Sequence, residues 1–264
     1  MMKTTICNIL VALTISIVSL HVQAQSLIEQ AEKAYTADNY SEALSLYLKA
    51  AEEEGISSDL FYNIGNCYYR MGKNGKAILY YERALNINPA NDYARQNLEF
   101  VNNRITDNTN VDETNIIGQM INSIINTMSS NAWATTAIVL FILMLGAIAI
   151  YVFSSNVLFR KIGFFGGIVL LILTIFTNCF AYKSYKKISQ KRYAIITVSS
   201  ATLSTSPRVP KDKSEEAFIL NEGTKIYILD SVVTKSGDIE NVWFDVKADD
   251  THRAWINKTN IDII

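Results

Sequence analysis

The sequence predicts a multidomain membrane protein that joins an all-α repeat solenoid, a two-helix transmembrane hairpin and a small all-β barrel. Three observations lead to this fold class. Small and aromatic residues recur with a period of about 34 residues before residue 105. Two uncharged apolar runs follow, at 132–153 and 162–182, and each is long enough to cross a bilayer as a helix. From Tyr193 onward the apolar pattern alternates with a period of two, which is typical of strands.

The N-terminal residues 1–24 have the features of a secretory signal peptide. Lys3 provides the positive start, an apolar stretch follows, and Val22-Gln23-Ala24 is a small-residue cleavage pattern. An uncleaved anchor is the alternative interpretation. Under either one, the segment that follows is exported.

Composition argues against several classes of function. The net charge is −1, so no basic face for nucleic acid is expected. Cys7, Cys67 and Cys179 are far apart and lie in different settings, which indicates neither a disulfide framework nor a metal site. His21 leaves with the leader, and His252 is interpreted as a solvated turn residue rather than a catalytic base. We therefore expect no enzyme activity, no metal and no cofactor.

Residues 25–105 are predicted to form two helix-pair repeats and a capping helix over Asp92–Arg104, which is expected to present a polar face because it ends the solenoid. The better repeat has its signature at Phe61, Ile64, Gly65 and Tyr68 on one helix, at Ala77, Tyr81 and Ala84 on the next, and at Pro89. One period earlier, Ala43, Tyr47 and Ala50 have the same spacing. Gly65 and Ala77 are expected where helices cross closely, and Gly72 and Gly75 where the chain turns between helices.

This pattern resembles the tetratricopeptide repeat family. The resemblance implies a concave groove that holds a peptide or a partner helix, and it places the groove at Tyr62, Asn63, Asn66, Tyr69 and Arg70. The family's carboxylate clamp uses lysines where this sequence has other residues, so a neutral extended segment or a helix suits the groove better. The alternative is that these aromatic residues only complete the solenoid surface.

The runs at 132–153 and 162–182 are interpreted as an antiparallel transmembrane hairpin in the lipid bilayer. Trp133, Tyr151 and Tyr182 lie at the ends, where amphipathic rings prefer the headgroup level. Gly163 and Gly167 have the spacing that allows close helix packing. The stretch 106–131 has apolar residues at helical spacing and is interpreted as an amphipathic linker at the membrane surface, or alternatively beneath the solenoid.

Orientation rests on two conflicting signals. The exported leader places the loop with Arg160 and Lys161 in the cytoplasm and returns the C-terminus outside. The segment after the second span is more basic, with five cations that favour the cytoplasm: Lys183, Lys186, Lys187, Lys191 and Arg192. We give more weight to the leader and predict an inner-membrane protein with its repeat and C-terminal domains on the periplasmic side.

Residues 193–264 are predicted to form the β-barrel. β-rich runs occur at 194–198, 225–230, 241–246 and 253–256, and an irregular loop with Pro207 and Pro210 follows the first. The segments LNEGTKIYIL, NVWFDVK and RAWIN resemble the bacterial SH3-like family, with Ala254 in place of the usual glycine. In that family some members bind cell-wall peptides, which makes Trp243 and Trp255 contact candidates. Core or rim packing is the alternative role of both tryptophans.

The order of leader, repeats, hairpin and SH3-like domain resembles the tetratricopeptide-containing members of the Bacteroides aerotolerance (Bat) operon group. That resemblance implies partners with von Willebrand factor A domains in the same membrane and a link to envelope or oxidative stress. The predicted function is a membrane-anchored scaffold for protein–protein interaction. The alternative is a peptidoglycan-binding module presented from the membrane by the SH3-like domain.

Overall fold

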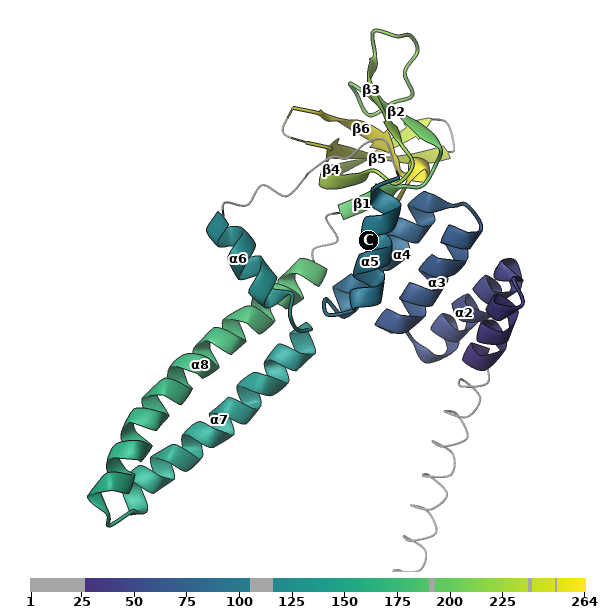
Figure 1. Cartoon of the computed structure of the whole chain (residues 1–264). Helices are drawn as coiled ribbons and strands as arrows, with labels where there is room; N and C mark the ends of the chain where they lie inside the picture. Colours follow the sequence, from purple (N-terminus) through teal and green to yellow (C-terminus); the bar gives the residue numbers. More distant parts are fainter. Residues whose placement is uncertain (1–26, 105–115, 190–192, 237–238, 250) are drawn as a thin grey trace, which may run out of the picture. The chain divides into compact units, whose positions relative to one another are not determined.

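The computed structural model describes residues 27–104, 116–189, 193–236, 239–249 and 251–264 (Figure 1). The predicted signal peptide lies outside these residues, as do Cys7 and His21. The described chain falls into two compact units. One unit holds the repeat helices and the C-terminal sheet, and the other holds the three helices between them in sequence.

The repeat helices alternate with short turns. A helix over residues 27–36 is followed by α2 (Tyr40–Glu54), α3 (Ser58–Arg70), α4 (Asn74–Ile87) and α5 (Asp92–Asn102). Ser57 and Asn91 cap α3 and α5, since each side chain accepts a hydrogen bond from a backbone N–H in the first turn of its helix. Every alanine and tyrosine of the predicted repeat signature on the second helices is buried: Ala43, Tyr47, Ala50, Ala77, Tyr81 and Ala84.

Two glycines explain how α3 and α4 meet. A Cβ atom on Gly65 would lie 2.6 Å from the Tyr81 ring, so only glycine lets the two helices approach this closely. Gly72 has a positive φ of 75° in the turn between the helices, a conformation that glycine adopts at no steric cost. The roles predicted for Gly65 and Gly72 are therefore confirmed.

The C-terminal domain is a seven-stranded antiparallel sheet with the order β3-β2-β6-β5-β4-β1-β7. Its strands are β1 (Tyr193–Ile196), β2 (Ser200–Ser204), β3 (Glu216–Asn221), β4 (Lys225–Ser236), β5 (Ile239–Lys247), β6 (Arg253–Asn257) and β7 (Ile261–Ile263). The predicted runs correspond to β1, β4, β5 and β6, whereas β2, β3 and β7 were not predicted. One apolar core, which includes Ile196, Leu203, Ile226, Val246 and Ile256, draws on most of the strands.

The prediction of a closed barrel is wrong, because edge strands β3 and β7 are not paired with each other. Within the sheet, the ladder between β2 and β6 has the single register pair Ser204 and Trp255, next to a register shift in β2. At the β7 edge, Arg83 of α4 donates a hydrogen bond of 2.6 Å to the carbonyl of Ile263 in β7. The repeat helix therefore lies against the strand that a closing partner would have to approach.

Helix α4 and the sheet form a continuous interface within the first unit. Ile195 of β1 is fully buried in a cluster with Ile78, Leu79 and Tyr81 of α4 and Val101 of α5. Polar contacts surround this cluster: Gly75 N to Glu222 Oε1 at 2.8 Å, Lys76 Nζ to Asp262 Oδ2 at 2.6 Å, and Lys225 Nζ to Glu82 Oε1 at 2.8 Å.

This interface corrects the role predicted for Gly75. The residue belongs to α4 rather than to the turn before it. A Cβ atom there would lie 2.6 Å from the carbonyl oxygen of Ile196 in β1. Gly75 is therefore needed for the close approach of the sheet, and Glu222 supplies a carboxylate to an N–H in the first turn of α4.

The second unit consists of α6 (Ile116–Ile125), α7 (Ser130–Phe153) and α8 (Val157–Ser189). Two of its helices, α7 and α8, are long and apolar enough to cross a membrane. They pack along each other and are joined by residues 154–156, so Arg160 and Lys161 lie in α8 rather than in the loop. Helix α6 exposes Met120, Ile121 and Ile124, and its last carbonyl, that of Ile125, accepts a hydrogen bond of 3.0 Å from the Trp133 indole.

Candidate functional site

The predicted groove residues lie on α3, and three of them meet matching residues of α5. Tyr62 lies 6.2 Å from Tyr93 between ring centroids. Asn66 accepts a hydrogen bond of 2.9 Å from Asn97. The ring centroid of Tyr69 lies 5.9 Å from that of Phe100 in an edge-to-face contact. We call the surface formed by Tyr62, Asn66, Tyr69, Tyr93, Asn97 and Phe100 the α3–α5 face.

The α3–α5 face is a product of helical spacing. On α3 the three residues occur at positions i, i+4 and i+7, which places them on one stripe of a helix. The α5 residues have the same spacing. Aromatic, amide and aromatic pairs therefore follow one another along the two helices.

Asn66 is the polar centre of the face. Its Oδ1 accepts hydrogen bonds from the Tyr81 hydroxyl at 2.8 Å and from Asn97 Nδ2 at 2.9 Å. These bonds use its acceptor, while its Nδ2 makes no hydrogen bond in the described part of the chain. Asn97 Oδ1 has none there either. The pair thus offers N–H donors and a carbonyl acceptor side by side, which complements the backbone of an extended peptide.

The Tyr81 hydroxyl depends on Asn66 for its hydrogen-bond acceptor. Tyr81 is fully buried, and burial raises the pKa of its phenol far above the ordinary value of 10, although hydrogen bonding with the Asn97 side chain opposes the shift. Its hydroxyl is therefore a neutral donor that orients Asn66. Part of the polar centre is structural, since a buried hydroxyl needs a partner.

Tyr69 and Arg70 have different neighbours. The Tyr69 hydroxyl accepts a hydrogen bond of 2.9 Å from Arg104, and the Arg104 guanidinium also stacks 4.1 Å from the Phe100 ring centre. Arg70 points to the first repeat, where it stacks 4.5 Å from the Tyr40 ring and pairs with Asp38 at 3.3 Å. Of the five predicted residues, Arg70 therefore serves contacts within the solenoid.

Asn63 is half-buried on α3, and its side chain makes no hydrogen bond in the described part of the chain. The two aromatic residues of α5 are open to solvent, with Tyr93 72% exposed and Phe100 47% exposed. Their exposure departs from the prediction that α5 presents a polar capping face. The signal was present in the sequence, because Tyr93, Asn97 and Phe100 have the spacing already assigned to α3.

The two tryptophans of the sheet lie on the side opposite its core. Trp243 is only 4% exposed, and Trp255 is half-buried. Between them in the ladder, Asp245 pairs directly with Trp255 and is held by the Arg253 guanidinium, with Nε at 3.0 Å from Oδ1. The sheet thus places both indoles on one face but leaves only Trp255 accessible for contact.

The remaining reactive side chains have structural surroundings. Cys67 is buried in the repeat core, and burial raises the pKa of its thiol to about 12. His252 is exposed and its Nδ1 lies 2.6 Å from Oδ2 of Asp249. Within the described residues, no group of three His, Cys, Asp or Glu side chains is placed to hold a metal ion.

Comparison with known proteins bears on the helices that carry the α3–α5 face. No curated protein matches the chain. Residues 58–91, which comprise α3, α4 and the turn before α5, match the family model of the tetratricopeptide repeat. The chain thus contains a tetratricopeptide repeat, and this repeat supports a role in protein–protein interaction.

Proposed function

We propose that the protein is a membrane-anchored scaffold whose α3–α5 face binds an extended, uncharged segment of a partner protein, and that it works by binding rather than by catalysis. The observation that carries the proposal is the row of three matched pairs between α3 and α5. Tyr93 and Phe100 provide exposed aromatic area, and such residues are enriched at protein interfaces. The two asparagines provide a donor and an acceptor for a peptide backbone.

Because the α3–α5 face is uncharged, it favours a partner segment that is also uncharged. No carboxylate or ammonium group belongs to the face, and Arg70 and Arg104 at its end are engaged by Asp38 and Phe100. An acidic or basic peptide would therefore gain little there. A segment with aromatic or aliphatic side chains at alternate positions could place them against the rings while its backbone meets Asn66 and Asn97.

Membrane insertion of α7 and α8 as a hairpin explains how the repeats and the sheet can pack together in the first unit. The repeats precede the helix pair in sequence and the sheet follows it, yet they pack together through Ile195 and Gly75. An even number of crossings returns the chain to the side from which it started. We propose that this side is the periplasm of an inner membrane, because residues 1–24 have the pattern of an export signal.

Cysteine labelling with a membrane-impermeant maleimide tests this topology. In a background without native cysteines, Ser57→Cys and Thr251→Cys should react from the periplasmic side, and Ser155→Cys at the hairpin tip should not. Labelling of Ser57→Cys and Thr251→Cys from opposite sides would exclude the hairpin. Reaction of Ser155→Cys alone from the periplasm would support the orientation favoured by the basic residues that follow residue 182.

The order of the domains supports a more specific proposal. It resembles the tetratricopeptide (BatE) branch of the Bat aerotolerance group, so we propose membrane proteins with von Willebrand factor A domains as partners. Peptidoglycan binding by the sheet is the second candidate, with half-buried Trp255 as its contact residue. Loss of binding to purified cell wall in Trp255→Ala would favour that candidate.

In-membrane cross-linking followed by affinity purification tests the scaffold proposal. The informative variant is Tyr93→Ala with Phe100→Ala, since both side chains are exposed and their loss leaves the Asn66–Tyr81 bond intact. The matched control is Ile56→Ala with Val209→Ala, two exposed apolar residues of the same unit outside the face. The proposal predicts that discrete proteins are lost with the first variant and kept with the second. Equal recovery with both variants would overturn it.

A further inference from the structure

The tip of the helix hairpin combines two cations with an apolar cavity. A cavity of about 330 Å³ is lined by Tyr151 of α7 and by Val157, Arg160, Lys161, Phe164 and Phe165 of α8. The Arg160 guanidinium lies 5.7 Å from the centre of the Tyr151 ring. Tyr151 and Phe164 in turn pack with ring centroids 5.6 Å apart. The lining of this cavity thus combines aromatic rings with two cations.

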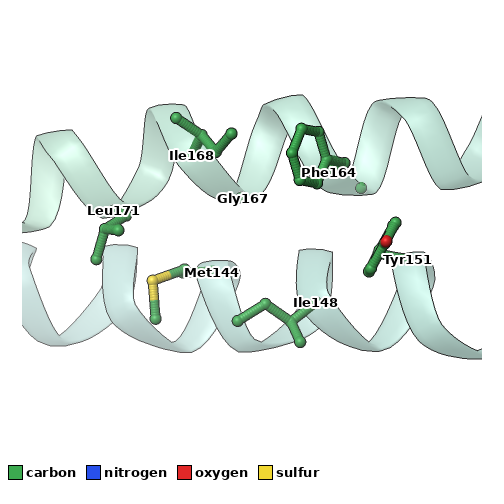
Figure 2. A pocket seen from close by; sticks show the side chains of 8 residues that line it. Met144, Ile148, Tyr151, Phe164, Gly167, Ile168 and Leu171 are labelled. Atoms are coloured by element: carbon green, nitrogen blue, oxygen red, sulfur yellow. The ribbon is translucent and has the colours of Figure 1, made fainter.

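A second, separate cavity lies between the helices. It has a volume of about 220 Å³ and shares Tyr151 and Phe164 with the first. Its other lining residues are apolar or glycine, and they come from both helices: Met144, Ile148, Gly163, Gly167, Ile168 and Leu171. Figure 2 shows Leu171 and Tyr151 pointing into the space between α7 and α8. The two cavities thus share an aromatic wall, and we call the second one, between α7 and α8, the apolar channel.

Two glycines account for the shape of this channel. A Cβ atom on Gly163 would lie 2.7 Å from the carbonyl oxygen of Ala147, so the helices touch at this point. At Gly167 a Cβ atom would meet nothing closer than the Ala147 methyl at 3.9 Å. The helices are thus in contact at Gly163 and leave room one turn further on.

The two cations have no acidic partner near them. No Asp or Glu occurs from Ser130 to Ser189 in the sequence. In the described part of the chain, neither Arg160 nor Lys161 forms an ion pair. A pair of cations at the end of a membrane-spanning hairpin attracts a negatively charged headgroup.

We propose that the hairpin tip binds one anionic phospholipid, with the phosphate between Arg160 and Lys161 and one acyl chain in the apolar channel. Charge complementarity selects the headgroup, and the aromatic residues Tyr151, Phe164 and Phe165 hold the start of the chain. This site rests on the proposed membrane insertion of α7 and α8 but not on the proposed function of the α3–α5 face.

Native mass spectrometry of the full chain in mild detergent tests the site. The probes are palmitoyl-oleoyl phosphatidylglycerol and the zwitterionic phosphatidylcholine with the same chains. The variant Arg160→Gln with Lys161→Gln removes the tip charges, and Lys183→Gln with Lys186→Gln removes two charges near the other end of α8 as the matched control. Since each cation near a bilayer surface contributes about a fivefold preference for anionic lipid, the tip variant should lose at least about tenfold in affinity for phosphatidylglycerol. The control should retain it.

Two further measurements separate the alternatives. Gly167→Leu fills the channel and should weaken phosphatidylglycerol binding while both tip cations remain. Inorganic phosphate should not displace the lipid, and displacement would show a simple anion site and overturn the proposal. Equal losses in the tip and control variants would also overturn it. Extraction of the protein from membranes by alkaline carbonate would show that membrane insertion itself fails, whereas an inserted protein with unselective lipid binding would exclude only this site.

Discussion

Replacement of Gly75 by alanine tests whether the repeats and the sheet share one interface. The added Cβ atom would lie 2.6 Å from the Ile196 carbonyl oxygen and 2.7 Å from Cγ of Glu222. The carbonyl cannot retreat alone, because it accepts a hydrogen bond of 2.8 Å from Gly223. Nor can the Ile196 N–H, which donates to Thr224 at 3.1 Å. Either α4 or the start of the sheet must move.

The size of the effect follows from three contributions. Overpacking of this kind costs about 1–3 kcal/mol, and loss of the hydrogen bond to the Glu222 carboxylate costs about 1.5–3 kcal/mol. Alanine within a helix returns about 1 kcal/mol relative to glycine. We therefore expect the interface to weaken by about 1.5–5 kcal/mol, which raises the equilibrium constant for local opening by about 10-fold to 5,000-fold.

Hydrogen exchange of the full chain in detergent measures this opening. In Gly75→Ala, peptides that cover β1 and the first turn of α4 should lose protection. Gly166→Ala is the control, because a Cβ atom on that glycine of α8 would meet nothing within 4 Å. If β1 keeps its protection in Gly75→Ala, or the variant becomes more stable as helix propensity alone would make it, the described interface is incorrect.

Three other perturbations have defined outcomes. Burial opposes ionisation of Asp262, but its bonds to Lys76 and a neighbouring threonine hold its pKa below the ordinary 3.8. Its contribution to the stability of the interface is therefore present above that pH and is lost as acid titrates the carboxylate. Hydrogen exchange in β7 should rise at low pH in wild type and less in Asp262→Asn. Asn66→Ala leaves the buried Tyr81 hydroxyl without its acceptor and should lower the stability of the repeats by about 1–3 kcal/mol in chemical unfolding. Asn66→Asp keeps an acceptor and should cost less. Equal losses in the two variants would argue against the hydrogen bond. Because burial raises the pKa of Cys67 to about 12, iodoacetamide should modify it at pH 8 only after unfolding, and rapid modification of the folded chain would contradict its burial.

The repeat helices could be predicted because their determinants are local. Ala77, Tyr81 and Ala84 recur one period after Ala43, Tyr47 and Ala50, and all six are buried as the spacing required. The apolar lengths of α7 and α8 were equally visible. These features depend on residues within one turn or one repeat, so a single sequence is enough to find them.

The features that were missed depend on contacts between distant segments. Gly75 meets Glu222, which is 147 residues away, so its spacing near Gly72 suggested only a turn. The open edge at β7 is contacted by Arg83 of the repeats, and no pattern in the strands themselves reveals this contact. Likewise, the sequence left Trp243 as either a contact residue or a core or rim residue, and only the structure shows that it is 4% exposed.

Only the α3 half of the α3–α5 face was predicted from the sequence. The resemblance to the tetratricopeptide repeat placed Tyr62, Asn66 and Tyr69 in the groove, but α5 was interpreted as a polar cap because solenoid ends are usually polar. The structure pairs each of these residues with a residue of α5, so the last helix contributes as much to the face as the matched repeat does. A search of α5 for the α3 spacing would have identified this second stripe.

Site-specific photocross-linking tests the central claim most directly. A photoreactive phenylalanine analogue is placed at Tyr93, on the α3–α5 face, or at Ile56, an exposed position outside it, and each full-length protein is irradiated in its native membrane. We predict one or a few discrete adducts from position 93, mapped by mass spectrometry to an uncharged segment of the partner, and none of these adducts from position 56. The same adducts from both positions, or adducts from position 56 alone, would contradict the assignment of the α3–α5 face as the binding surface.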